Sequence, residues 1–156
     1  MSVPVVQQRD AQPAMVMRAE VPMGEIGEAL HRLLPPVWAH IQELGRVPAG
    51  APFTRFLGFA AGGLMIIEAG VPTLDALPSS AEVASIVLDG GPCVTLMHAG
   101  SYDGLPARHA ELDEWFEWTG RKPAGFRWEA YLTGPGAEPD TSKWHTLITQ
   151  ALEPIE

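Results

Sequence analysis

The chain has 156 residues, and its 19 acidic and 10 basic side chains give a formal net charge of -9. This length suits one domain, and a hydrophobic fraction of 46% is enough to build a core, which excludes wholesale disorder. The acidic balance argues against binding nucleic acid through its phosphates, whereas it suits cationic small molecules or a basic protein surface. The single cysteine, Cys93, excludes an internal disulfide and a multi-thiolate metal site.

Signals for targeting, metals and common catalytic motifs are missing from the sequence. The N-terminus has no basic region followed by an apolar run, and no apolar stretch approaches the roughly 18 residues of a membrane span. The five histidines lack metal-ligand spacing, and we interpret His109 and Asp113, four residues apart, as a solvated helix pair. We therefore expect a cytoplasmic protein with no metal, no other cofactor, and neither nucleic acid nor membrane as a partner.

The first half of the chain alternates strand-like and helical patterns. Apolar residues with helical spacing extend from Ile26 to Leu44, and Gly45 is expected to end this helix. Because proline lacks an N–H donor, Pro35 and Pro36 predict two helical pieces that meet near residue 35, or one kinked helix. Two hairpins are predicted around it, the first across the turn-like sequence RDAQP: residues 2–8 with 14–20, and residues 53–59 with 63–69.

The second half repeats this order around a helix predicted from Leu105 to Thr119. Asp103 is its candidate cap, Pro106 suits its first turn, and Gly120 is expected to end it. Two further hairpins are predicted, the first across Asp89-Gly90-Gly91 and the second across a Gly/Pro-rich loop: residues 82–88 with 92–98, and residues 126–132 with 144–152.

A literal repeat supports an internal duplication. The sequence GRVPAG at residues 45–50 recurs as GRKPAG at residues 120–125, each time between a helix and a strand. We predict an α+β fold in which two hairpin–helix–hairpin halves, about 1–72 and about 80–154, form a single domain over residues 1–156. Its antiparallel sheet and two main helices are expected to follow a pseudo-two-fold axis, and the crevice between the halves is a natural ligand site.

The strand over residues 126–132 carries the most informative side chains. Alternation puts Trp128 and Leu132 on an apolar face, expected to pack on the helices, and points Glu129 and Tyr131 the other way. A carboxylate beside aromatic rings is what recognition of an apolar cation requires, because the rings supply contact area and cation–π attraction. The alternative is a solvent-facing Glu129 paired with Arg127.

Five segments, taken in order, resemble the GyrI-like small-molecule-binding domain family, which is also called the AraC effector-binding domain. They are PFTRFLGF (52–59), IEAGVP (67–72), HAGSYDGL (98–105), WEAY (128–131) and WHTLITQAL (144–152). The likeness covers nearly the whole chain. It implies a duplicated α+β fold with an antiparallel sheet and two helices. We expect a free-standing member of the family, with no DNA-binding module before residue 1.

The resemblance also implies a ligand site. Glu129 matches the acidic residue of the family's pocket, and Tyr131 is the next pocket position on the same strand face. Trp144 matches an aromatic residue on the last strand, Tyr102 lies where the motif before the second helix reaches the site, and Phe56 lies on the corresponding first-half strand. The chain departs from the family pattern in having Ser101 where proline is usual, and Phe56 near a position that is often tyrosine.

Three functions remain open at this point. The first is binding of amphipathic, often cationic or aromatic small molecules, with Glu129 as the counter-charge. The second is hydrolysis of cyclopropane-containing genotoxins, as in some free-standing relatives, with Glu129 as general base and Tyr131 as a second catalytic group. His98 and Tyr102 are the other polar candidates close to Glu129, and His98 is expected to contact the ligand. The third is a protein-binding role of the gyrase-inhibitor kind.

Overall fold

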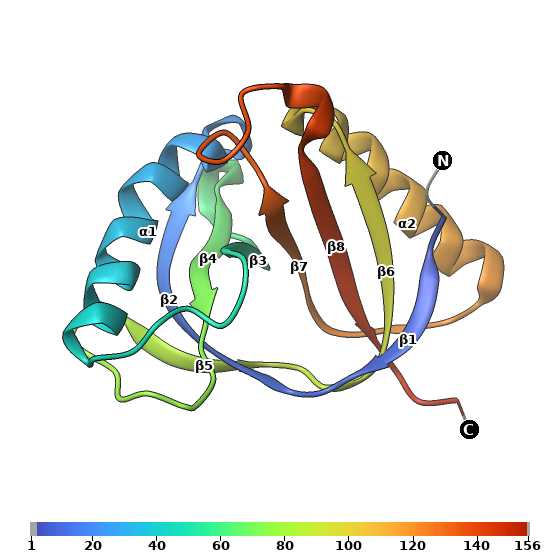
Figure 1. Cartoon of the computed structure of the whole chain (residues 1–156). Coiled ribbons are helices and arrows are strands. Elements are labelled where there is room, and N and C mark those ends of the chain that lie inside the picture. Colours follow the sequence, from blue (N-terminus) through green and yellow to red (C-terminus); the bar gives the residue numbers. More distant parts are fainter. Residues whose placement is uncertain (1–2, 156) are drawn as a thin grey trace. The chain divides into compact units, whose positions relative to one another are not determined.

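The computed structural model describes residues 3–155, so residue 2, the start of the first predicted strand, and residues 1 and 156 lie outside the described residues. The chain divides into two compact units. The middle unit is Ala11–Asp89, and the terminal unit combines the segment up to Asp10 with the chain from Gly90 onward. Each unit joins antiparallel strands to one long helix, which is the predicted α+β fold (Figure 1).

The middle unit contains one helix and four strands. Its sheet has the order β3-β4-β2-β5, with antiparallel neighbours. The elements are β2 (Gln12–Val21), α1 (Ile26–Glu43), β3 (Phe53–Phe59), β4 (Met65–Pro72) and β5 (Ala84–Leu88), with the 3-10 turns η1 (Met23–Glu25) and η2 (Ala61–Gly63). The predicted hairpin of residues 53–59 and 63–69 is confirmed by the pairing of β3 with β4.

The terminal unit repeats this arrangement. Its sheet has the order β1-β6-β8-β7, again with antiparallel neighbours. The elements are β1 (Val5–Arg9), β6 (Gly91–Ala99), α2 (Leu105–Thr119), β7 (Pro123–Thr133) and β8 (His145–Leu152), with the 3-10 turns η3 (Tyr102–Gly104) and η4 (Thr141–Lys143). In both units the strand before the helix pairs with the second strand after the helix, which in turn pairs with the first strand after it. This shared order agrees with the predicted duplication.

Two of the four predicted hairpins are wrong. β1 pairs with β6, so that Val5 lies opposite Thr95, and β2 pairs with β5, so that Val16 lies opposite Ala84. Both hairpins were predicted from local turn signals, whereas the strands that pair lie far apart in the sequence. Each unit therefore receives one outer strand from the other half of the sequence.

Helix α1 contains both prolines and is not divided into two pieces. Pro35 and Pro36 lie inside Ile26–Glu43, where each removes a backbone donor. The helix lies beside β2 and β4 (Figure 1). Its apolar side buries Leu33, Leu34, Val37 and Ile41, among others. Burial of such side chains contributes roughly 1.5–3 kcal/mol each, which offsets the lost hydrogen bonds. Gly45 follows with φ +71°, as predicted for the residue after a helix.

Helix α2 begins and ends at the predicted residues. Pro106 lies in its first turn, and Gly120 ends it with φ +71°. Asp103 is not its cap, because this residue lies in η3 and the helix starts after Gly104 without a side-chain cap. Leu105 and Leu112 seat α2 on the sheet of the terminal unit, against an apolar cluster of Val94, Leu96, Ile148 and Leu152.

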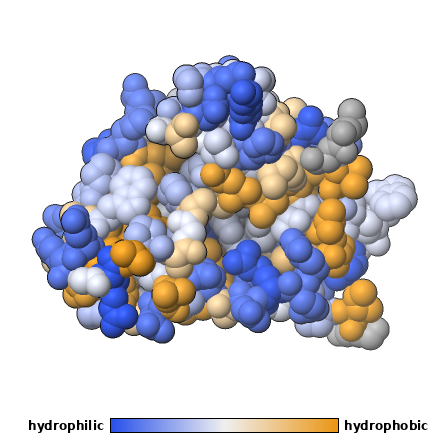
Figure 2. Space-filling model, in the orientation of Figure 1, coloured by the Kyte–Doolittle hydropathy of each residue, from blue (hydrophilic) through white to orange (hydrophobic). Residues whose placement is uncertain are grey.

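The surface mixes polar and apolar side chains on the face shown in Figure 2. Over residues 3–155, no helix has the length and apolar character needed to cross a membrane.

Candidate functional site

Glu129 lies on the face of the sheet that α2 covers. Pairing of β7 with β8 puts Glu129 opposite Ile148, and directly opposite residues project from the same face. Ile148 packs in the apolar cluster beneath α2, with Leu112. The residue is only 6% exposed, so the alternative of a solvent-facing Glu129 is wrong. The predicted assignment of faces is also reversed, because the Glu129 face, not the Trp128 face, meets the helix.

The opposite face of β7 is also buried for part of its length. Trp128 is buried as predicted, and the guanidinium of Arg9 lies 4.9 Å from the centre of its ring. Leu132 was expected beside it in the core, but this side chain is 47% exposed. The register between β7 and β8 shifts between Tyr131 and Thr133, which ends the strict alternation before Leu132.

Two side chains hydrogen-bond to the carboxylate of Glu129. The hydroxyl of Tyr131 donates to Oε1 over 2.7 Å. Nε2 of His109, on α2, lies 2.9 Å from Oε2. The seating of α2 on the sheet thus brings a histidine from the helix to a carboxylate on the strand. His109 is a site residue that sequence reasoning missed.

Arg127 belongs to the same network but does not pair with Glu129. Its Nη2 donates to Asp113 Oδ1 over 2.8 Å, and its Nε donates to Gln150 Oε1 over 3.3 Å. Its Nη1 lies 3.4 Å from Nδ1 of His109. His109 and Asp113 are therefore joined through Arg127 of the neighbouring strand. The four-residue spacing on α2 was the only signal in the sequence for this arrangement.

Three aromatic side chains gather beside the carboxylate. The ring of Tyr102, from η3, lies 5.5 Å from that of Tyr131 and 5.0 Å from that of Trp144, measured between centroids. The indole Nε1 of Trp144 donates to the carbonyl oxygen of Glu138 over 2.7 Å, which fixes the ring. Burial, and after it the negative charge of Glu129, raises the pKa of Tyr102. The Tyr102 hydroxyl therefore stays protonated at neutral pH.

His98 holds the loop that carries Tyr102. Its Nε2 lies 2.7 Å from the carbonyl oxygen of Ser101, and the N–H of Gly100 donates to the carbonyl oxygen of Trp144 over 2.9 Å. The imidazole is buried, and its Nδ1 has no hydrogen-bond partner within the described part of the chain. His98 therefore supports the position of Tyr102 from beneath the loop.

The structure brings together Glu129, Tyr131, Tyr102 and Trp144, with His98 below the Tyr102 loop. Phe56 belongs to the middle unit, where it lies opposite Ile67 and packs against the core under α1.

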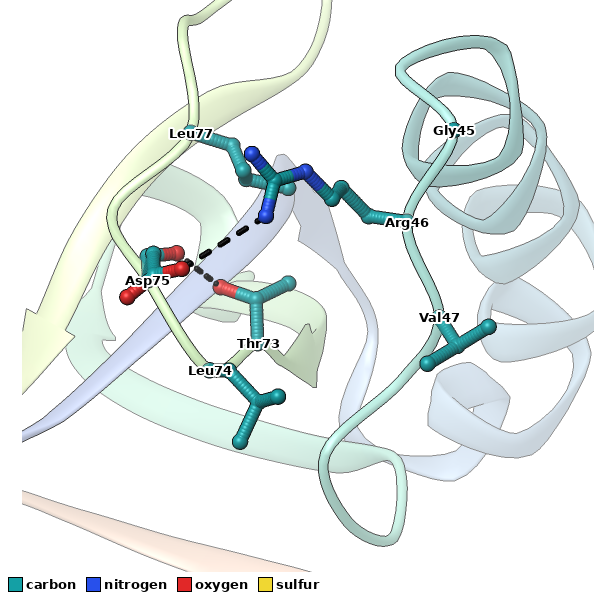
Figure 3. Close-up of a pocket in the computed structure, with 7 residues that line it drawn as sticks. All are labelled: Gly45, Arg46, Val47, Thr73, Leu74, Asp75 and Leu77. Carbon is teal, nitrogen blue, oxygen red and sulfur yellow. Dashed lines mark hydrogen bonds and ion pairs between the residues drawn. The ribbon is translucent and has the colours of Figure 1, made fainter.

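The middle unit also has a small cavity that contains none of the predicted site residues. It has a volume of about 230 Å³ and lies between residues 45–47 and the connector after β4 (Figure 3). Arg46 forms an ion pair with Asp75 at 3.5 Å, and Thr73 and Leu77 lie beside it. Ligand pockets usually have volumes of about 300–1,000 Å³, so this cavity is small for an organic ligand.

Among residues 3–155, no cluster of three or more His, Cys, Asp or Glu side chains is arranged to hold a metal ion.

Comparison with known proteins assigns the family. The model of the GyrI-like small molecule binding domain matches residues 2–149, and the chain therefore belongs to this family. This confirms the resemblance seen in the sequence. A search of curated proteins finds no match.

Solved structures share the fold at low sequence identity. The C-terminal domain of EcmrR is 19% identical, with a TM-score of 0.85 and 99% of each chain covered. In the complex of EcmrR with DNA, at 20% identity and a TM-score of 0.85, 99% of this chain covers 58% of the EcmrR chain. A hydrolase from Listeria innocua is 14% identical, with 96% and 91% of the two chains covered and a TM-score of 0.65. SAV2435 bound to tetraphenylphosphonium is 11% identical, with 97% and 94% covered and a TM-score of 0.59.

Proposed function

We propose that this small-molecule binding domain takes up amphipathic organic cations, with Glu129 as the counter-charge. The observation that carries the proposal is which side chains contact this buried carboxylate. Its partners are a phenol and an imidazole, while the guanidinium of Arg127 pairs with Asp113. A buried carboxylate is costly unless a positive charge compensates it. A ligand that brings its own positive charge relieves this cost, whereas a neutral or anionic ligand does not.

The aromatic cluster suits the apolar part of such a ligand. Tyr102, Tyr131 and Trp144 offer large, rigid surfaces whose ring faces attract cations by about 0.5–2 kcal/mol each. The structural neighbour SAV2435 binds tetraphenylphosphonium, a cation enclosed by phenyl rings. That compound is a suitable probe for this protein.

The proposal is tested by calorimetric titration with two ions of the same shape and opposite charge. Tetraphenylphosphonium should bind at least about tenfold more tightly than tetraphenylborate, since close charge pairs contribute about 1.5 kcal/mol or more. The net charge of -9 favours any cation at long range, so the comparison is made at about 0.5 M salt, where surface charges are screened. Equal affinities, or tighter binding of the borate, would contradict the proposal.

A second candidate function is hydrolysis of strained cyclopropane-containing compounds. It is favoured because a second candidate catalytic group, the hydroxyl of Tyr131, lies 2.7 Å from Oε1 of Glu129. Glu129 would take a proton from water while the water oxygen bonds to a ring carbon. The carbon–carbon bond of the ring would break, and its electron pair would pass to an electron-accepting group of the substrate, which would then receive the proton that Glu129 took from water. Incubation with a cyclopropane-bearing alkylator and mass analysis for the hydrated product tests this function, and the absence of that product would exclude it for the compound used.

A further inference from the structure

The environment of Glu129 differs from that of a second buried carboxylate in the same chain. Glu68, on β4 of the middle unit, is 5% exposed, and Nη2 and Nε of Arg55 lie 2.6 and 2.7 Å from its Oε1. A guanidinium thus directly neutralises the charge of Glu68. Glu129 is 6% exposed and has Arg127 two residues away on its own strand, yet His109 and Tyr131 contact its two oxygens. A guanidinium thus contacts one buried carboxylate, whereas an imidazole and a phenol contact the other.

The contacts of His109 indicate which of its nitrogens carries the proton. Nδ1 lies 3.4 Å from Nη1 of Arg127, and Nε2 lies 2.9 Å from Oε2 of Glu129. A guanidinium has five N–H donors and no acceptor, so Nδ1 must present its lone pair to Arg127. The proton then resides on Nε2 and is donated to Glu129. A doubly protonated ring would instead direct an N–H group at the guanidinium.

The charges of this network leave one negative charge at Glu129. Arg127 is matched by Asp113 at 2.8 Å, and a neutral His109 adds nothing. Tyr131 donates to Glu129, the ring of Tyr102 lies beside that of Tyr131, and Arg108 and Glu111 on α2 pair with each other at 2.6 Å. An imidazolium at position 109 would cancel the charge of Glu129, as Arg55 cancels that of Glu68.

We propose that Arg127, held by Asp113, fixes His109 as the neutral tautomer protonated on Nε2, so that Glu129 keeps a negative charge for a cationic ligand. His109 and Arg127 are thus positioning residues that determine the charge selectivity of the site. The inference about the tautomer stands on the contacts alone, while its consequence for ligands rests on the proposed function.

The consequence for ligands is tested by changing the charge at position 109. In His109→Gln, the amide can donate to Glu129 and accept from Arg127, so the preference for tetraphenylphosphonium over tetraphenylborate should stay within about threefold of that of the unchanged protein. His109→Arg puts a fixed cation against Glu129 and should reduce this preference at least about tenfold. If His109→Arg does not fold, as judged by circular dichroism, His109→Lys replaces it. Equal preference in the neutral and the charged variant would overturn the proposal.

The tautomer is tested without any ligand, by nitrogen-15 NMR of the imidazole rings at pH 7.5, with His109→Gln identifying the signal. We expect the pattern of a neutral ring protonated on Nε2, a pattern that Arg127→Lys should keep and Arg127→Met should lose. A proton on Nδ1, an imidazolium, or no change in Arg127→Met would overturn the proposal. Because this measurement needs no ligand, it remains decisive even if tetraphenylphosphonium shows no preferred binding, a result that would count against the proposed function alone.

Discussion

Replacing Glu129 with glutamine should weaken the binding of tetraphenylphosphonium at least about 30-fold, or about 2 kcal/mol, because the ligand loses its buried counter-charge. Binding of tetraphenylborate should become tighter. Isothermal titration calorimetry measures both affinities. The pKa of Tyr102 should fall toward 10, because the negative charge that helps to raise it is removed. Ultraviolet titration of tyrosinate detects this change, since the chain has only two tyrosines.

The Glu129→Gln variant is expected to fold. The amide oxygen can accept from Nε2 of His109, and the amide N–H can donate to the hydroxyl of Tyr131, which reverses that hydrogen bond without breaking it. Glu117→Gln is the matched control, because it removes the same charge from an exposed position of α2. Equal affinity for tetraphenylphosphonium in Glu129→Gln and Glu117→Gln would contradict a role for the buried carboxylate.

Replacing Leu112 with alanine should lower the free energy of unfolding by about 3 kcal/mol. Its side chain is fully buried in the apolar cluster beneath α2, and truncation of such a leucine leaves a cavity. Leu132→Ala removes the same atoms from a side chain that is 47% exposed and should cost less than about 1 kcal/mol. Urea denaturation monitored by tryptophan fluorescence gives both values. A loss in Leu132→Ala as large as about 3 kcal/mol would contradict the exposure of Leu132, and a loss below about 1 kcal/mol in Leu112→Ala would contradict the burial of Leu112.

Elements with signals at both ends were predictable from the sequence. Helix α2 was predictable because Pro106 and Gly120 mark its two ends. Each of these residues affects the backbone only locally, so its effect can be inferred from the sequence. The hairpin of β3 and β4 is confirmed because its two strand-like runs are neighbours in the sequence, joined only by the short segment 60–63. The expected hairpin across Asp89-Gly90-Gly91 was wrong because a turn signal is local, whereas β6 pairs with β1, more than 80 residues earlier in the chain. The pairing of a strand with one from the other half of the sequence cannot be inferred from the residues of the two predicted turns.

The candidate site was predictable in its strand residues but not in its helix residue. Alternation correctly put Glu129 and Tyr131 on one face, since residues two apart in a strand share a face. It could not tell which face α2 covers, because Trp128 on the other face is also buried. The contact of His109 with Glu129 depends on how α2 crosses the sheet, and no periodicity within either element encodes that crossing.

A crystal structure of the protein with tetraphenylphosphonium bound would locate the ligand directly. We expect the ligand in contact with the Glu129 carboxylate, with a phenyl ring against Tyr102 or Trp144. A ligand bound elsewhere, such as in the cavity beside Arg46 and Asp75, with no contact to Glu129, would contradict its role as the counter-charge.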